Sequence, residues 1–401
     1  MSLADANAEY WVEYSNLQHV KHELIRHYLN GWFPKMTLGA TGCKRLLYID
    51  THAGRGRHLQ GQLGSPFVAL TTLSDHQARD RILKSAEVRF HFIERDEQNL
   101  AALNLELNAP SLPANVVVTP ESGDCFQIIE RGIASVENVG QAFPPSFIFV
   151  DPYGFKLPGQ LLRKLMSYPK VELFVNVIWR ELDMAIQQVR GNKAPQPTKI
   201  PRNQASLFDD DPEFLPVPSA QRRPANPQNL IPTLNTVFDG DAWRGIDAPD
   251  ADGRAEQCAD LFRTITKARW GTHIRMLDNG RVRYFLLHLT NHDDGRDLMK
   301  DCIWKACPAG GFSASKADSP RHQFLIQPEP DLTPLCAWVR EKLTSGAKRW
   351  HELGYLLREE LWRDTHLNQA LREMRTAGEI QATGKFFPKH NPLLSLTAKR
   401  G

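Results

Sequence analysis

Short apolar runs alternate with amphipathic segments along the first half of the chain. The apolar runs have the length of buried strands, and the segments between them carry apolar residues at helical spacing. The expected strands are 45–50, 88–96, 115–124, 146–154 and 171–179, and the expected helices are 65–85, 97–108, 125–138 and 158–168. This alternation predicts an α/β domain with a mostly parallel sheet and helices on both of its faces.

Two further segments belong to the same pattern. Residues 9–33 have apolar residues at helical spacing, which predicts an amphipathic helix before the first strand. Residues 272–291 contain two strand-like runs on either side of Asp278-Asn279-Gly280-Arg281, a sequence that favours a tight hairpin turn. We therefore expect an antiparallel strand pair at the end of an otherwise parallel sheet.

The rest of the chain divides into an insertion and a C-terminal domain. Residues 190–232 are rich in Pro, Gln, Asn and Ser, and we interpret them as an insertion, lid or mobile loop of a domain that spans 1–330. Residues 331–401 contain three short amphipathic segments, followed at 379–388 by two short extended pieces around a glycine. Three helices and a small hairpin of this length predict a winged helix-turn-helix domain.

In that fold the third helix and the wing contact nucleic acid. The expected contacts are His366, Asn368, Gln369, Arg372 and Arg375 on the helix, with Lys385 in the wing. The tail carries twelve Lys and Arg against eight Asp and Glu, in a chain whose whole net charge is +3. A small protein–protein module is the alternative for this domain.

Composition limits the remaining classes of protein. The first residues lack the basic and apolar segments of a secretory signal, and no apolar run approaches the length of a membrane span. Six cysteines are scattered without CxxC or Cys/His pairs, and the 14 histidines show no HxH or HExxH group. We expect a cytoplasmic protein without a metal site.

Acidic residues follow the apolar runs at the positions where the expected strands end. Asp50 precedes a loop that runs from His52 through Ala53 to Gly54 and Gly56. Glu94 ends the second strand, Asp124 and Cys125 follow the third, and the fourth ends in Asp151-Pro152-Tyr153-Gly154. Ligands of open parallel sheets bind beyond the carboxyl ends of the strands, so these residues form the candidate site.

Their chemistry fits S-adenosylmethionine. The glycines allow the backbone to approach a ligand closely, and Glu94 can accept hydrogen bonds from both hydroxyls of a ribose. Asp124, with Cys125 beside it, can take an adenine amine, and Asp50 can hold the ammonium group of the methionyl part directly or through water. A dinucleotide fits less well because the loop lacks the full GxGxxG. A plain strand-to-turn reading of each piece also remains open, and a nuclease has little support.

Two of these motifs resemble those of amino-group methyltransferases that act on nucleic acids. "DTHAGRG" looks like their D-x-F-A-G-x-G loop, with His52 in place of the aromatic residue. "FIFVDPYG" is similar to their fourth motif and nearer to the D-P-[FY]-G of tRNA guanine-N2 methyltransferases. The resemblance implies a Rossmann-like class I methyltransferase sheet. It also implies that Asp151 and the Pro152 carbonyl orient a base amine, while Tyr153 stacks on the extruded base.

A longer resemblance covers nearly the whole chain. The order of its segments is similar to that of the three-Cys-motif partner protein (TcmP) family, which combines a methyltransferase-type core with a winged helix. The segments are "HVKHELIRHYLNGW", "LLYIDTHAGRGRH", "GSPFVAL", "FHFIERD", "FIFVDPYG", "VELFVNVIWRELD" and "YFLLHLTNHDDGRDLMKDCIWK". This resemblance implies a partner protein with three clustered cysteines, of radical S-adenosylmethionine or iron–sulfur type.

Several assignments stay open at this level. A non-catalytic nucleic-acid-binding or assembly subunit is the alternative to an enzyme, with Trp304 either a docking anchor for the partner or a core residue. Arg55 and Arg57 either contact substrate phosphate or solvate the turn. Lys21 and His22 face either the site or the solvent, and the solvent is the stronger expectation.

Overall fold

The computed structural model describes residues 14–39, 42–108, 112–191, 227–308, 313–317 and 329–397. These residues form two compact units. One contains the described residues of Met1–Arg296 and Ser313–His322, and the other contains those of Asp297–Phe312 and Gln323–Gly401. Residues 297–308, which the sequence assigns to the first domain, therefore group with the C-terminal unit.

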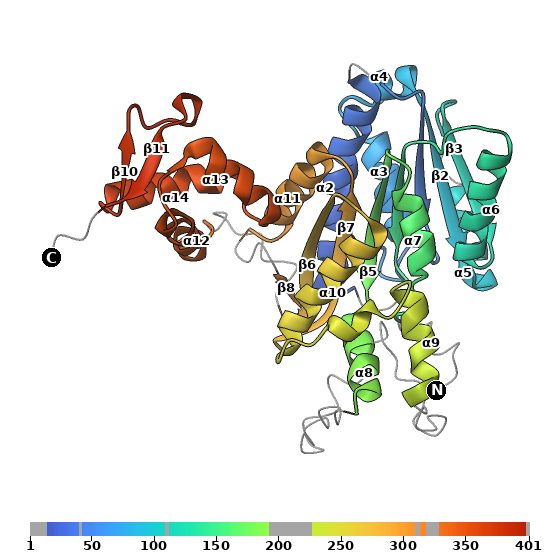
Figure 1. The fold of residues 1–401 in the computed structure, drawn as a ribbon. Helices are drawn as coiled ribbons and strands as arrows, with labels where there is room; N and C mark the ends of the chain where they lie inside the picture. Colours follow the sequence, from blue (N-terminus) through green and yellow to red (C-terminus); the bar gives the residue numbers. More distant parts are fainter. Residues whose placement is uncertain are drawn as a thin grey trace. The chain divides into compact units, whose positions relative to one another are not determined.

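The first unit is built on an eight-stranded sheet in the order β3-β2-β1-β4-β5-β7-β6-β8 (Figure 1). Its strands are β1 (Arg45–Asp50), β2 (Glu87–Glu94), β3 (Val116–Ser122), β4 (Ser146–Val150), β5 (Val171–Val177), β6 (Trp270–Asp278), β7 (Arg281–Thr290) and β8 (Ser313–Ser315). Strand β7 alone runs antiparallel to its neighbours among these strands. The predicted mostly parallel sheet is confirmed, and so is the hairpin, whose Asn279 and Gly280 have φ of 50° and 71°.

Helices connect these strands. They are α2 (Asn16–Leu38), α3 (Ser65–Ser74), α4 (Arg79–Ser85), α5 (Glu97–Leu107), α6 (Cys125–Asn138), α7 (Gly159–Met166), α8 (Trp179–Val189), α9 (Pro227–Val237), α10 (Ala251–Thr266) and α11 (Asp293–Ala306). The single helix expected over 65–85 is two helices. Residues 192–226 of the expected insertion lie outside the described residues, but its end is not a loop, since α9 begins at Pro227.

The two faces of the sheet carry different cores. Aromatic side chains cover one face, where Tyr28 of α2 stacks on Phe147 of β4 with ring centroids 5.0 Å apart. Aliphatic side chains of β1, β4, β5 and β7 cover the other face beneath α6, α7 and α10 (Figure 1). Because side chains alternate along a strand, each strand contributes to both cores, and α2 covers the aromatic face.

Three buried polar side chains fasten α2 to the sheet below this aromatic core. The Tyr28 hydroxyl donates to Glu172 at the start of β5, and His288 Nε2 lies 3.0 Å from the same carboxylate oxygen. All three side chains are at most 3% exposed. A buried acceptor shared by two partners leaves both unsatisfied if it is removed.

We therefore expect Glu172→Ala to lower the free energy of unfolding by about 3 kcal/mol, since it strands two buried polar groups. Chemical denaturation at pH 7 measures the change. The control is Asp80→Ala, which removes an exposed ion pair to Arg79 and should cost less than about 1 kcal/mol. Equal losses of unfolding free energy in the two variants would contradict the role of Glu172 as a shared buried acceptor.

Besides the α11 residues that it includes, the C-terminal unit has three described α-helices and a small antiparallel sheet. The elements are α12 (Thr333–Thr344), α13 (Trp350–Leu356), α14 (Asp364–Thr376), β9 (Lys348–Arg349), β10 (Ile380–Thr383) and β11 (Leu393–Leu396), with sheet order β10-β11-β9. The three helices lie where the sequence predicts them. The second strand of the hairpin does not, because it is Leu393–Leu396 instead of the stretch that ends at residue 388.

Trp304 is a core residue of this unit. It is 5% exposed, its ring stacks on Trp362 at 5.1 Å, and its indole N–H donates to the Leu361 carbonyl at 2.8 Å. A side chain enclosed in this way cannot anchor a docking partner. The core interpretation of Trp304 is therefore the correct one.

Candidate functional site

The carboxyl ends of β1, β4 and β5 bring three polar side chains to one face of the sheet. Strand alternation places Asp50, Asp151 and Asn176 on the face that α2 covers, in register with the buried aromatic residues below them. The chain continues from β1 to one side of the sheet and from β4 to the other. The site therefore lies at the topological switch point, where open α/β sheets bind their ligands.

Helix α2 supplies the partner of Asp151. Lys21 Nζ lies 2.7 Å from Asp151 Oδ2, and Asn176 Nδ2 donates to Asp151 Oδ1 at 2.6 Å. Burial alone would raise the pKa of Asp151, but the Lys21 charge and these two hydrogen bonds hold the pKa below its ordinary value. Asp151 is therefore ionised, with each oxygen accepting one hydrogen bond.

The expectation that Lys21 and His22 face the solvent is wrong. Lys21 is 2% exposed and His22 is 5% exposed. His22 Nδ1 lies 2.8 Å from the Tyr14 hydroxyl, and burial lowers the pKa of this histidine well below its ordinary value. Helix α2 covers the strand ends closely enough to bury its own polar residues against them.

Asp50 is fully buried and incompletely hydrogen bonded. Its Oδ1 accepts the His52 backbone N–H at 3.3 Å, whereas its Oδ2 makes no hydrogen bond of normal geometry with the residues that the structure describes, although the Ser65 hydroxyl lies close enough to affect the carboxyl group. Burial raises the pKa of Asp50 to about 7; the Ser65 hydroxyl lowers it, and the negative charge of Asp151 raises it further. A buried acceptor without a donor costs about 1–3 kcal/mol, so this oxygen is suited to receive a donor from a water or a ligand.

This shift predicts how stability depends on pH. The pKa of Asp50 rises from 3.8 to about 7 on folding, so the folded state binds more protons than the unfolded state between these values. Its contribution is most favourable below pH 4 and is lost as pH rises through 7, by about 4 kcal/mol in all. Denaturation across pH 4–8 should show this trend in the wild type relative to Asp50→Asn, and parallel curves would contradict it.

The glycine loop is held by Glu94. The Gly54 N–H donates to Glu94 Oε2 and the Asp96 N–H to Glu94 Oε1, both at 2.7 Å. Burial raises the pKa of Glu94, and these backbone hydrogen bonds oppose the rise. Each oxygen keeps one lone pair for a ribose hydroxyl. In this structure Glu94 supports the loop from the end of β2.

The glycines of the loop meet two separate requirements. Gly54 and Gly56 have φ of 63° and 84°, in the region that favours glycine. A Cβ on Gly56 would lie 2.7 Å from the Phe67 ring and 2.9 Å from Leu103. Gly56 is therefore required for packing between α3 and α5, which the sequence alone does not indicate.

The remaining predicted residues of the first unit surround this loop. Asp124 is the exposed N-cap of α6, with its side chain accepting the N–H groups of residues 126 and 127 at 3.1 Å. Cys125 is buried, with Sγ 3.9 Å from His52 Nε2, and burial lowers the pKa of His52 to about 4. Tyr153 is 67% exposed, and its ring centroid lies 6.1 Å from that of His52.

The two arginines of the glycine loop, Arg55 and Arg57, differ in their contacts. Arg57 Nε lies 3.2 Å from Glu106 Oε2, and its guanidinium also donates to the Gly61 carbonyl at 2.9 Å, so it fastens the loop internally. Arg55 is half-buried. Arg55 is thus the better placed of the two for a substrate phosphate.

The predicted reading helix of the C-terminal unit is exposed only in part. His366 is 3% exposed and contacts Trp304, so its expected role as a contact is wrong. Asn368 accepts the Trp350 indole N–H at 3.0 Å, and Gln369 donates to Glu373 at 3.1 Å. The exposed cations that remain are Arg372, Arg375 and Lys385.

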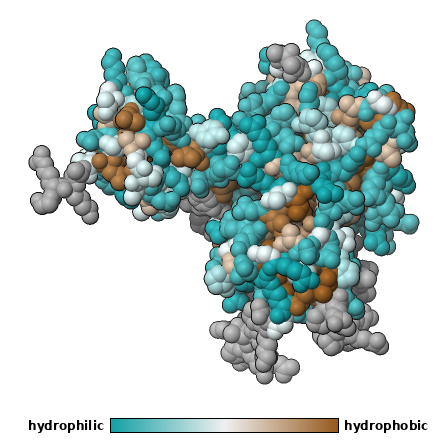
Figure 2. All heavy atoms as spheres, in the orientation of Figure 1, coloured by the Kyte–Doolittle hydropathy of each residue, from teal (hydrophilic) through white to brown (hydrophobic). Residues whose placement is uncertain are grey.

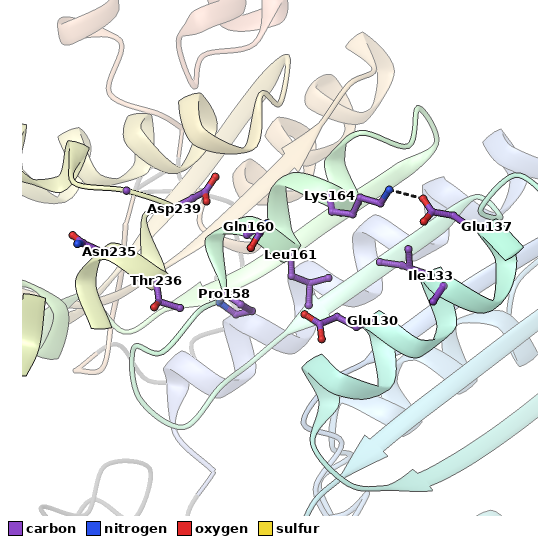
Figure 3. Close-up of a pocket in the computed structure, with 12 residues that line it drawn as sticks. Glu130, Ile133, Glu137, Pro158, Gln160, Leu161, Lys164, Asn235, Thr236 and Asp239 are labelled. Carbon is purple, nitrogen blue, oxygen red and sulfur yellow. Dashed lines mark ion pairs between the residues drawn. The ribbon is translucent and has the colours of Figure 1, made fainter. Parts of the chain in front are cut away.

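A surface hollow of about 920 Å³ lies elsewhere, between α6, α7, the end of α9 and the residues that follow α9 (Figure 3). Glu137 and Lys164 form an ion pair on its wall, and Glu130 and Asp239 also line it. None of the strand-end acids lines this hollow. Its acidic wall has no feature that selects a ligand, and we place the candidate site at the strand ends instead.

The described ranges contain neither a metal-binding cluster nor a membrane-spanning helix. No group of three or more His, Cys, Asp or Glu side chains there could hold a metal ion. None of the helices in those ranges is long and apolar enough to cross a membrane.

Comparison with known proteins identifies no family. No protein-family model matches the chain, and neither does any curated protein. Among solved structures, protein LPL1258 from Legionella pneumophila str. Philadelphia 1 is 15% identical over 43% of this chain and 73% of that chain, with a TM-score of 0.27. A structure from Klebsiella pneumoniae described as an O-methyltransferase is 12% identical over 70% of this chain and 91% of that chain, with a TM-score of 0.29. Likenesses this low carry no argument, so the interpretation depends on strand order and site geometry.

Proposed function

We propose that the chain binds S-adenosylmethionine at the carboxyl ends of β1 and β2 and transfers its methyl group to an exocyclic amine of a nucleic-acid base. The observation that carries the proposal is the buried Asp50 carboxylate, with one oxygen that makes no hydrogen bond of normal geometry with the described residues, beside Asp151-Pro152-Tyr153. The sheet order, with β7 antiparallel between β5 and β6, supports a Rossmann-like class I methyltransferase fold.

The residues present fit this cofactor. Asp50 Oδ2 would accept a hydrogen bond from the ammonium group of the cofactor's methionyl part. Glu94 would use its remaining lone pairs to accept hydrogen bonds from the ribose hydroxyls. Asp124, beside the buried Cys125, would accept a hydrogen bond from the adenine amine. The backbone of Ala53 and Gly54 would lie along the ligand. S-adenosylmethionine supplies an electrophilic methyl group on a sulfonium sulfur when it is bound.

The chain itself would position the target amine. Asp151 keeps a free lone pair on each oxygen, so its side chain and the Pro152 carbonyl can accept the two amine hydrogens. The exposed Tyr153 ring would stack on the extruded base. An exocyclic amine is a weak nucleophile, so most of the rate gain would come from holding it in line with the methyl group.

We also propose that the C-terminal unit is a winged helix-turn-helix domain that contacts nucleic acid. Its three helices are followed by an antiparallel hairpin, and Arg372, Arg375 and Lys385 are exposed cations on α14 and the hairpin. Asn368 and Gln369 would have to exchange their present hydrogen bonds to join these contacts. Arg55 would meet the phosphate of the target nucleotide in the first unit.

One observation favours a different function. Asp50 is fully enclosed, and both oxygens of Glu94 are engaged by the backbone. A core closed in this way also suits a non-catalytic nucleic-acid-binding subunit that assembles with a three-Cys-motif protein.

Transfer of tritiated methyl from S-adenosylmethionine separates the two functions. The purified protein is incubated with total tRNA, rRNA, genomic DNA and single nucleotides in parallel. We expect label in one nucleic-acid class, at an exocyclic amine of adenine or guanine after digestion to nucleosides. No label in any class from well-folded protein, alone and with the partner added, would favour the non-catalytic subunit.

A further inference from the structure

The connection between β10 and β11, residues 384–392, contains two adjacent phenylalanines with opposite environments. Phe386 packs inward, with its ring centroid 5.0 Å from that of Trp350 and the Arg375 guanidinium 4.5 Å from its ring. Phe387 points outward and is 54% exposed. The face drawn in Figure 2 is mainly hydrophilic, with hydrophobic residues in separate patches. A single exposed hydrophobic residue is ordinary on a protein surface, so what sets Phe387 apart from its partly buried neighbour Phe386 is the chemistry of the loop around it.

The loop that carries Phe387 is held at its C-terminal end and by hydrogen bonds within the loop. Asn391 has a left-handed φ of 45°, its side chain accepts the His351 N–H at 2.9 Å, and its carbonyl accepts from Arg349 at 3.2 Å. Within the loop, the His390 N–H donates to the Phe387 carbonyl at 3.0 Å. These contacts fix the loop before any partner binds, which lowers the entropic cost of binding through the exposed ring.

The exposed ring lies in a basic stretch of the chain. Lys385 and Lys389 flank it in sequence and are exposed, and residues 384–392 contain no acidic side chain. Arg349, exposed, lies opposite Leu393 at the end of the loop. Glu352, an acid at this end of the unit, accepts the Arg349 backbone N–H.

An exposed aromatic ring among cations fits an unpaired base with a phosphate on either side. Bases stack on aromatic rings whatever their sequence, and lysines take the flanking phosphates. In a duplex the base faces are already stacked on one another, so the ring needs a single strand, a loop or a bulge. Tyr355 offers a contrast within the same unit. It is 66% exposed, but the Arg358 guanidinium already lies 5.1 Å from its ring centroid, and two glutamates follow at 359 and 360.

We propose that Phe387 is a stacking platform for an unpaired base of a nucleic acid, with Lys385 and Lys389 contacting the adjacent phosphates. This inference rests on the nucleic-acid part of the proposed function and makes the preferred substrate one with single-stranded nucleotides. The ring would hold such a segment on the C-terminal unit independently of methyl transfer.

Fluorescence anisotropy with the full chain tests the proposal. The probes are a fluorescein-labelled 12-nucleotide single strand, as RNA and as DNA, and the matching duplex. Phe387→Ala should weaken single-strand binding about 5- to 100-fold and duplex binding less than about 2-fold. Phe387→Trp should keep the affinity, and Tyr355→Ala, the matched control, should change it less than about 2-fold. Lys385→Ala with Lys389→Ala should lower the salt dependence by about one to two phosphate contacts.

Three results would overturn the proposal. They are no single-strand binding by the wild type, equal losses in Phe387→Ala and Tyr355→Ala, and binding to anionic lipid vesicles through Phe387 without binding to nucleic acid. S-adenosylmethionine affinity, measured in the same variants, should not change. Wild type that binds S-adenosylmethionine but no single strand would mean that this inference fails while the proposed reaction stands. Wild type that binds the single strand but not the cofactor would mean the reverse.

Discussion

Replacing Asp151 with alanine is expected to lower methyl transfer about 10³-fold while leaving S-adenosylmethionine affinity nearly unchanged. Alanine removes the acceptor that orients the amine, and the cofactor residues are on other strands. Single-turnover transfer of tritiated methyl, with the cofactor dissociation constant measured in parallel, gives both quantities.

The matched control is Asp151→Asn. Both substitutions remove the negative charge beside Lys21, which is 2.7 Å from the native carboxylate. Asparagine keeps one acceptor oxygen and should retain far more activity than alanine. Equal activities in the two variants would mean that Asp151 accepts nothing from the substrate, and loss of cofactor binding in both would place Asp151 in the cofactor site.

Replacing Lys21 with methionine is expected to lower the free energy of unfolding of the first unit by about 3–5 kcal/mol at pH 7. The change strands the Asp151 carboxylate, whose side chain is 18% exposed. Because the native pKa of Asp151 lies below its ordinary value, the stabilisation is present at neutral pH and is lost as pH falls through that lowered pKa. Chemical denaturation at several pH values measures it.

A double-mutant cycle isolates the pair. Lys21→Met combined with Asp151→Asn removes both charges of the pair. The double variant should recover most of the lost stability, with a coupling energy above about 1 kcal/mol. Arg131→Ala is the control, because its ion pair to Glu121 is exposed and should contribute little. Additive losses in the cycle would show that the two charges do not stabilise one another.

The sequence predicts the parts of the site that local pattern determines. An apolar run ended by an acid marks Asp50, Glu94 and Asp151, because buried strands are short and their polar ends are abrupt. The hairpin at Asn279-Gly280 is equally local, since only certain residues adopt its positive φ values.

The sequence does not predict the contacts that depend on distant segments. Lys21 is a polar residue on an amphipathic helix, and its burial depends on that helix covering a strand end 130 residues away. The predicted exposure of His366 is wrong for the same reason, because α14 packs this polar side chain against Trp304. Asn176 did leave a signal, since it and Glu172 are the two polar residues in the buried run of β5 and each must find a partner.

Isothermal titration of S-adenosylmethionine at pH 8 and pH 6 shows whether the strand ends bind the cofactor. We expect micromolar binding at pH 8 that weakens at pH 6, because protonation of Asp50, with its pKa about 7, removes the charge opposite the ligand's ammonium. Asp50→Asn should bind about 10- to 100-fold more weakly at pH 8 and lose the pH dependence. No binding by folded wild type, or equal affinity in Asp50→Asn, would contradict cofactor binding at the strand ends.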